Sequence, residues 1–249
     1  MNRPQVRVPE SMTHAIDRML EEIIERARVP PEHIVAEAAK RGLPMSGTRT
    51  SDRLAGLRFC APAQLDPLAR QYITSSALIA GAQGFMANLG GAATLALSLP
   101  ADTVATLAAT VRATSGAMGS YGFETETEAG AAQLRVGLLV AAGVSMVTVE
   151  GANVLVSRLS QQLLQRAAAK RLEAALTGQI SRRLATGLFW GYLPRAVPVV
   201  GGMIGGGVNA GLVRTMGGRA RAHYRSLLVQ WQRNRGFTPG VVWDLGEPR

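Results

Sequence analysis

The chain has 249 residues, including 28 glycines, 12 prolines and one cysteine, and 47% of its residues are hydrophobic. This composition is typical of a globular protein and excludes a disordered chain, a collagen-like repeat and a disulfide-stapled scaffold. The formal net charge is +10, and the excess lies in residues 158–249, which have 14 basic and 3 acidic side chains against 13 and 14 in residues 1–157.

The N-terminal segment predicts a helical hairpin. Residues 12–27 place apolar side chains at spacings of three and four, which predicts an amphipathic helix. Pro31 suits the first turn of a second helix that runs to about Arg41 and stops at Gly42. No apolar stretch precedes this pair, so we expect no cleaved secretory signal and a cytoplasmic location.

The remaining chain predicts a series of further helices and no strands. A polar loop at 43–51 leads into them, and the expected helices are 67–88, 100–119, 127–148, 151–176, 179–192 and 198–233. The predicted fold class is all-α, a compact Gly/Ala-rich multi-helix bundle with an N-terminal amphipathic helical hairpin. We expect three parts: the hairpin and loop at 1–51, a helical domain at 52–236 and a tail at 237–249.

Charged residues are absent from position 71 to position 101, a stretch long enough to cross a membrane. Eight polar residues are spread along it and Gly90-Gly91 interrupts it, which favours a closely packed soluble core over insertion by hydropathy. Peripheral attachment to a membrane is compatible with this interpretation, and integral insertion stays open.

The segment VPVVGGMIGGGVNAGLV at 197–213 is rich in glycine. Its glycines stand four residues apart in three pairs, which is the spacing of a glycine zipper, where two helix backbones approach closely. Each glycine costs about 1 kcal/mol relative to alanine within a helix, so we expect close packing to offset this cost. The predicted helix-packing residues are Gly201, Gly202, Gly205, Gly206, Gly207 and Gly211.

Arginines flank this glycine-rich segment. Between residues 174 and 243 there are nine arginines and no acidic residue, so this part of the chain favours a polyanion as its partner. The residues predicted to contact an anionic surface are Arg195, Arg214, Arg219, Arg221 and Arg225. An anionic membrane surface is the favoured partner, and nucleic acid is unlikely because aromatic residues make up only 5% of the chain.

Motifs for common enzyme chemistry are missing. Lysine occurs only at 40 and 170, which excludes a P-loop, and the three histidines stand alone, so we expect no metal and no cofactor. A glycine pattern at 205–210 matches the dinucleotide motif only formally, since no acidic residue follows until Asp244. Cys60 is expected to be a buried, inert thiol.

Asp102 has two interpretations. In the first turn of a helix that begins near Pro100, its charge would stabilise the positive end of the helix dipole. Alternatively, it is a buried acid in a cleft, and the weak catalytic candidates are then Asp102, Arg112 and Tyr121. The helix-end interpretation is favoured.

Two blocks resemble the EcsC family of bacterial proteins. The first, 90–124, contains Leu-Pro-x-Asp at 99–102 and Tyr121-Gly122-Phe123; the second, 196–225, contains a Pro-x-x-Gly and glycine-rich pattern and ends in Ala-x-x-x-Tyr-Arg. The matching residues are Pro100, Asp102, Arg112, Tyr121, Gly122, Pro198, Gly201, Asn209, Ala220, Tyr224 and Arg225. The resemblance spans about 70–230, leaves the hairpin outside, and departs from the family at Glu124, where aspartate is common.

The resemblance implies a helical, membrane-associated protein that accompanies an ABC-type transporter, without an established reaction, cofactor or catalytic residue. We therefore expect a non-enzymatic accessory protein that contacts the inner membrane face, or a membrane partner, through its basic Gly-rich C-terminal part. An alternative is a hydrolase that acts on lipid or peptide through a pocket around the three catalytic candidates. A third is a nucleic-acid binder that uses the Arg-rich terminal helix, which requires the arginines to form one contiguous face.

Overall fold

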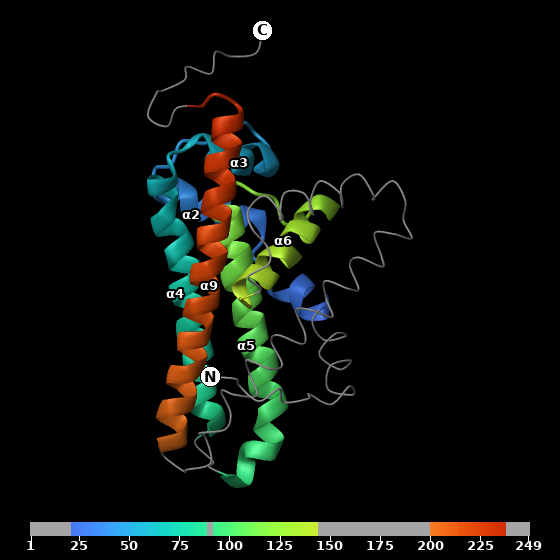
Figure 1. Ribbon diagram of the computed structural model, residues 1–249, viewed down its shortest axis with the longest axis vertical. Coiled ribbons are helices and arrows are strands. Elements are labelled where there is room, and N and C mark those ends of the chain that lie inside the picture. The colour runs from blue at the N-terminus through green and yellow to red at the C-terminus, as the bar shows by residue number, and fades with distance from the viewer. Residues whose placement is uncertain (1–20, 89–91, 144–199, 238–249) are drawn as a thin grey trace, which may run out of the picture.

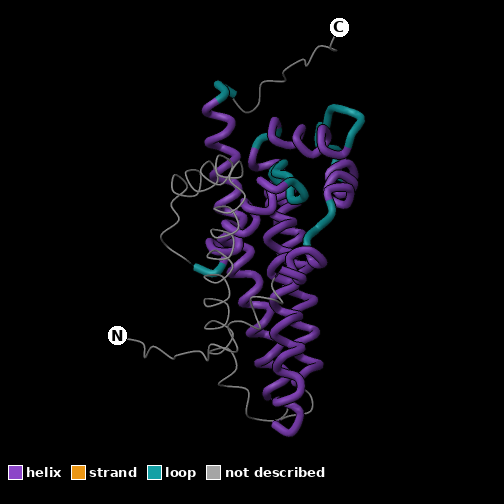
Figure 2. The backbone as a smooth tube through the Cα atoms, turned by 90° about the vertical axis from the view of Figure 1, so that its right-hand side faces the viewer, coloured by secondary structure: helices purple, strands orange, loops and turns teal. Residues whose placement is uncertain are grey.

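The computed structural model describes the backbone of residues 21–88, 92–143 and 200–237, and the side chains of 21–86, 104–143 and 206–237. Within these ranges the chain forms helices and turns without a strand, which confirms the all-α class (Figure 2). The predicted helices at 151–176 and 179–192, and the start of the one at 12–27, lie outside the described residues.

The N-terminal hairpin forms as expected. Residues 21–27 are helical and α2 spans Pro31–Lys40, with Pro30 in an extended conformation before it. Gly42 adopts a φ of +66°, and the amide of Leu43 donates to the carbonyl of Ala38, which closes the helix. A loop then leads to α3 (Thr50–Gly56) and to the short 3-10 helix η1 (Leu57–Phe59).

Helix α4 (Pro62–Asn88) begins one and a half turns earlier than Pro67, the start that the sequence suggested. The side chain of Gln64 accepts a hydrogen bond from the amide of Ala61 at 3.0 Å, so these residues form half of a capping box around Pro62. Pro67 lies inside the helix, where burial of Leu65 and Leu68 in the core outweighs the hydrogen bond that proline removes.

Helix α5 (Ala92–Ser120) also begins earlier than expected, since Pro100 lies within it rather than at its start. The helix-end interpretation of Asp102 is therefore wrong, because this residue lies ten positions after the first helical residue and outside the region of the positive dipole end. The break predicted at Gly90-Gly91 lies outside the described residues.

The last two described helices agree closely with their predicted starts. Helix α6 (Glu128–Ala141) has Thr127 as its N-cap, whose hydroxyl accepts from the amide of Gly130 at 3.0 Å, and it ends before Gly143, which has a φ of +80°. This end comes earlier than the predicted Thr148. Helix α9 (Val200–Asn234) is the longest in the described part, at 35 residues.

Helices α4, α5 and α9 run side by side along the long axis of the molecule (Figure 1). α9 is antiparallel to α4, because Gly81 of α4 lies against Gly206 and Ala210, whereas Asp66 lies near Arg221 and Arg225. Ile73, Ala113 and Gly217 meet at one level of the three helices. The hairpin, α3 and α6 pack around one half of this three-helix unit, the half drawn uppermost in Figure 1.

One hydrophobic cluster fills that upper half. It joins Ile34 of the hairpin to Leu65 of α4, Met118 of α5, Leu138 of α6 and Tyr224 of α9. Apolar residues on both sides of the loop at 43–49 belong to this cluster, although the predicted domain boundary follows residue 51. The division of the chain into three parts stays a prediction, but the described part of the hairpin shares its core with the helical domain.

Candidate functional site

Four polar side chains from three helical elements meet in the upper half of the bundle, and we call them the Asp66 cluster. Asp66 comes from α4, Tyr121 follows α5, and Arg221 and Arg225 come from α9. The Tyr121 hydroxyl donates to Asp66 Oδ1 at 2.5 Å, Arg221 Nη1 lies 3.5 Å from the same oxygen, and Arg225 Nε lies 3.4 Å from Oδ2. One carboxylate is therefore shared by a phenol and two guanidinium groups.

The turn after α5 fixes Tyr121 in this cluster. Gly122 has a φ of +81°, which favours glycine, and a Cβ there would also meet the carbonyl oxygen of Leu54 at 2.9 Å. Arg58 Nε donates to the carbonyl of Gly122 at 2.8 Å. The amide of Phe123 donates to the carbonyl of Met118. The Tyr-Gly-Phe motif thus ends the helix and turns the tyrosine ring into the core.

Burial raises the pKa of Tyr121, and the hydrogen bond to Asp66 raises it further. Tyr121 has no exposed surface, whereas the side chains of Asp66, Arg221 and Arg225 are 16%, 27% and 46% exposed. The hydroxyl therefore stays protonated at neutral pH and acts as a donor that orients the carboxylate, while the two guanidinium groups face the surface.

The neighbouring pair His223 and Tyr224 faces inward on α9. The Tyr224 hydroxyl donates to the carbonyl of Gln133 on α6 at 3.1 Å, and the tyrosine ring occupies the space left by the missing side chain of Gly137. His223 is 5% exposed, and burial lowers its pKa to about 4. This histidine is thus neutral at pH 7, and its role among the described residues is packing.

The three catalytic candidates are spread along one helix and the turn after it. Asp102, Arg112 and Tyr121 follow one another along α5 and its C-terminal turn, so the helical rise separates the first two by about 15 Å and the last two by about 13 Å. The side chain of Asp102 lies outside the described side chains. Of the three, Tyr121 is the one that belongs to the Asp66 cluster, and the pocket of the hydrolase alternative stays a prediction.

The glycine-rich segment packs closely at one position in the described part. Gly206 is buried, and a Cβ there would lie 2.7 Å from the carbonyl oxygen of Gly81 and 3.2 Å from Phe85 Cβ. Gly207 and Gly211 are exposed, and a Cβ at either would meet no atom within 4 Å. The helix-packing prediction therefore fails for these two residues in the described structure, because they lie on the outer face of α9.

The surroundings of Gly201, Gly202 and Gly205 lie outside the described side chains, although the three residues belong to α9. Arg195 and Pro198 lie outside the described residues altogether. Asn209 and Ala220 are buried on α9, as inward-facing positions of the second sequence block.

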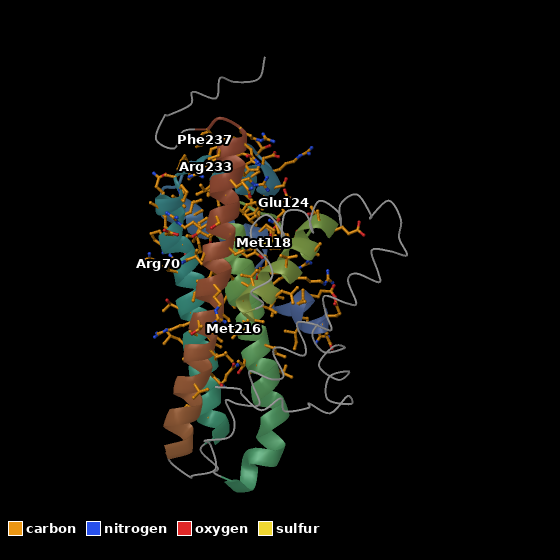
Figure 3. All side chains as sticks on the ribbon, viewed as in Figure 1. Arg70, Met118, Glu124, Met216, Arg233 and Phe237 are labelled. Atoms are coloured by element: carbon orange, nitrogen blue, oxygen red, sulfur yellow. The ribbon has the colours of Figure 1, made fainter. Side chains whose placement is uncertain are left out.

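The arginines of α9 do not form one contiguous face. Arg214, Arg221 and Arg225 recur at spacings of seven and four, which places them on one side of the helix. Arg219 lies elsewhere on the circumference and donates to the carbonyl of Ala141 at 3.3 Å. Arg233 lies near the C-terminal end of α9, as Figure 3 shows. The requirement of the nucleic-acid alternative is not met in the described part of α9.

Asp66 is the member of the cluster that sequence reasoning missed. The pair Asp66-Pro67 predicts a helix start, and this role alone explains a carboxylate at position 66. One feature of the sequence does indicate a partner for Asp66: it is the single acidic residue between Asp52 and Asp102. A partly buried carboxylate needs cationic partners, and in a segment with few charged residues these partners must come from elsewhere in the chain.

Two further observations limit the chemistry of the described residues. They contain no group of three or more His, Cys, Asp or Glu side chains that could hold a metal ion. Among the described helices, none is both long and apolar enough to cross a membrane.

Comparison with known proteins identifies one family. The model of the EcsC protein family matches residues 3–227, most of the chain. This match includes the N-terminal hairpin, which the motif resemblance had left outside. No curated protein and no solved structure matches the chain.

Proposed function

The chain belongs to the EcsC protein family, and we propose from its geometry that it is a non-enzymatic accessory protein attached to the periphery of an anionic membrane. The observation that carries this proposal is the charge distribution along the bundle. We call the lower end the half formed by residues 76–88 of α4, 92–111 of α5 and 200–213 of α9. Its sequence contains one charged residue, Asp102.

Exposed apolar side chains on the lower end support contact with lipid. On α4, Leu78, Ile79, Phe85 and Met86 are 61%, 47%, 39% and 67% exposed. Large apolar side chains this exposed and this close together are typical of an interaction surface. The part of α4 below residue 75 is about 20 Å long, which is comparable with one leaflet of a bilayer whose hydrocarbon core is about 30 Å thick.

Arginines border the lower end. Ala113, Ile73 and Gly217 meet at one level of the bundle. Arg112 directly precedes Ala113, and Arg214 precedes Gly217 by three residues. Both arginines therefore lie within one helical turn of that level. Arg214 is exposed and Arg112 is half-buried. Guanidinium groups at this level would meet anionic headgroups when the lower end enters the acyl region.

This arrangement modifies the role that the sequence suggested for the C-terminal part. We propose that the uncharged ends of α4 and α9 enter one leaflet of the membrane, and that Arg214 contacts headgroups. The favoured membrane is the inner membrane, approached from the cytoplasm. As an accessory protein it would act beside a membrane protein, and an ABC-type transporter is the partner that the family resemblance implies.

Flotation with vesicles of phosphatidylcholine and phosphatidylglycerol tests the proposal. The wild-type protein is expected to float with the vesicles, and binding should weaken as salt rises because the headgroup contacts are screened. Leu78→Asp combined with Met86→Asp should reduce binding by about 100-fold or more, since a charge inside the hydrocarbon region costs about 3 kcal/mol.

Ala63→Asp, compared with the single variants Leu78→Asp and Met86→Asp, is the matched control, because each of the three adds one negative charge and Ala63 is exposed near the other end of α4. This variant should float like the wild type. The proposal is wrong if the wild-type protein stays with the soluble fraction at low salt, or if the charges at positions 78 and 86 leave binding unchanged.

A further inference from the structure

The Asp66 cluster has more hydrogen-bond donors than its single carboxylate can use. Two guanidinium groups provide ten N–H donors. The sequence contains no other acidic residue between Asp52 and Asp102. Among the described residues, the contacts of Arg221 and Arg225 are those with Asp66. Two arginines and one aspartate leave one net positive charge at this position.

The contacts with Asp66 are also long for ion pairs. They measure 3.5 Å and 3.4 Å, whereas charge-assisted hydrogen bonds between a guanidinium group and a carboxylate are about 2.7–2.9 Å long. Asp66 is instead held firmly by the Tyr121 hydroxyl at 2.5 Å. The carboxylate is thus positioned from the core side, and the arginines approach it from the surface through Nη1 of Arg221 and Nε of Arg225.

The surface beside these arginines is open. Gly218 precedes Arg221 by three residues and Arg225 by seven, so the three residues follow one side of α9. A Cβ at Gly218 would meet no atom within 4 Å. A ligand between the two guanidinium groups could therefore approach the helix backbone without meeting a side chain at this position.

We propose that Arg221 and Arg225 bind a phosphate group, with Asp66 and Tyr121 as the residues that position the two arginines. Guanidinium groups match phosphate oxygens in a bidentate geometry. One net positive charge suits a singly charged phosphate such as a phosphodiester, which it neutralises. Tyr121 comes from the first of the two sequence blocks that resemble the family, and Arg225 comes from the second. Both residues contact Asp66.

The phosphate group could belong to a soluble molecule or to a lipid headgroup. Arg221 and Arg225 lie seven and eleven residues beyond Arg214 on α9, which is about 10 Å and 16 Å farther from the lower end. If Arg214 lies at headgroup level, the Asp66 cluster lies above it in the aqueous phase, which favours a soluble phosphate compound. The site itself does not depend on membrane attachment.

Calorimetric titration of the full-length protein with glycerophosphoglycerol, a soluble phosphodiester, tests the site. We expect saturable binding, weakened about tenfold by Arg221→Gln and by Arg225→Gln, because each change removes charge-assisted hydrogen bonds. Arg233→Gln, which removes an exposed arginine from the same helix, should leave the affinity unchanged. Far-UV circular dichroism of each variant checks that it folds.

Asp66→Asn provides a second variant that keeps both arginines. Asparagine keeps a side-chain oxygen that can accept from the arginines and so preserves their position, but it removes the competing negative charge, so phosphate binding should become several-fold tighter. Vesicles containing phosphatidylglycerol distinguish the source: if the lipid carries the phosphate, both arginine variants weaken vesicle binding while the soluble diester fails to bind. Leu78→Asp with Met86→Asp should abolish vesicle binding and leave binding of the soluble diester intact, which separates this site from the proposed membrane attachment.

The inference is overturned if neither the soluble diester nor the vesicles respond to the two arginine variants. It is also overturned if Arg233→Gln weakens binding as much as they do, since the effect would then reflect general charge rather than a site.

Discussion

At the scale of single residues, burial in this protein controls which polar groups can ionise. His223 and Tyr224 are adjacent on α9 and both face the core, yet only the tyrosine hydroxyl has a hydrogen-bond acceptor there. The Nε2 atom of His223 is buried without a partner among the described atoms. A buried imidazole of this kind is stable only in its neutral form.

His223 should therefore make the protein sensitive to mild acid. Its pKa in the folded state is about 4, below the ordinary value of 6.5, so the unfolded chain binds the proton more readily between these values. The contribution to stability is complete above about pH 6.5 and is lost as the pH falls toward 4. Between pH 7 and pH 5 the loss should be about 2 kcal/mol.

Urea unfolding of the wild type and of His223→Gln at both pH values measures this contribution. The variant should have a free energy of unfolding that falls less between pH 7 and pH 5, by about the same 2 kcal/mol. Equal pH dependence in the two proteins would mean that His223 is hydrated or paired in solution.

At the scale of elements, close contact between α4 and α9 depends on individual glycines rather than on the whole glycine-rich segment. Gly81 and Gly206 bring the two backbones together, and Ile73 fits against Gly217 on the same interface. Gly207, next to Gly206, lies on the exposed side of α9. Neighbouring positions that look equivalent in the sequence thus have opposite surroundings.

Alanine substitution of these two neighbours should have opposite effects on stability. Gly206→Ala should lower the free energy of unfolding by about 1–3 kcal/mol, because the new Cβ meets the backbone of α4, which cannot move without separating the helices. Gly207→Ala should raise it by up to about 1 kcal/mol through better helix propensity alone. Chemical denaturation measures both changes, and a stabilising Gly206→Ala would exclude close approach at this position.

At the scale of the whole molecule, the described helices form a charged half and an almost uncharged half. The upper half contains the hairpin, α3, α6 and the Asp66 cluster, whereas the described part of the lower end consists of three long helices (Figure 1). The hairpin side chain of Ile34 occupies the space left by Gly119 of α5, so the upper half unites residues far apart in the chain.

Ile34→Ala tests whether the hairpin and the bundle form one cooperative unit. Ile34 is 1% exposed, and removing its side chain should lower the free energy of unfolding by about 2–4 kcal/mol. Unfolding followed by far-UV circular dichroism and by tryptophan fluorescence should remain a single, coincident transition. A separate early transition would instead support an independently folded hairpin.

The sequence by itself determined the all-α class and the hairpin. These features depend on local properties: the periodicity of apolar residues, the helix starts at proline and the helix stops at glycine. It also determined that charge is distributed unevenly along the chain. Local signals failed at Pro67 and Pro100, which both lie inside long helices; at Pro67, burial of Leu65 and Leu68 outweighed the local cost of proline.

Only the tertiary structure decided which residues form a site. Asp66 and Tyr121 are 55 positions apart, and the two arginines lie about 100 positions beyond Tyr121 in the chain. The same applies to Gly206 and Gly207, which differ only in the direction that each faces. No local pattern encodes such proximity, because it depends on how α4, α5 and α9 align when their apolar faces are buried together.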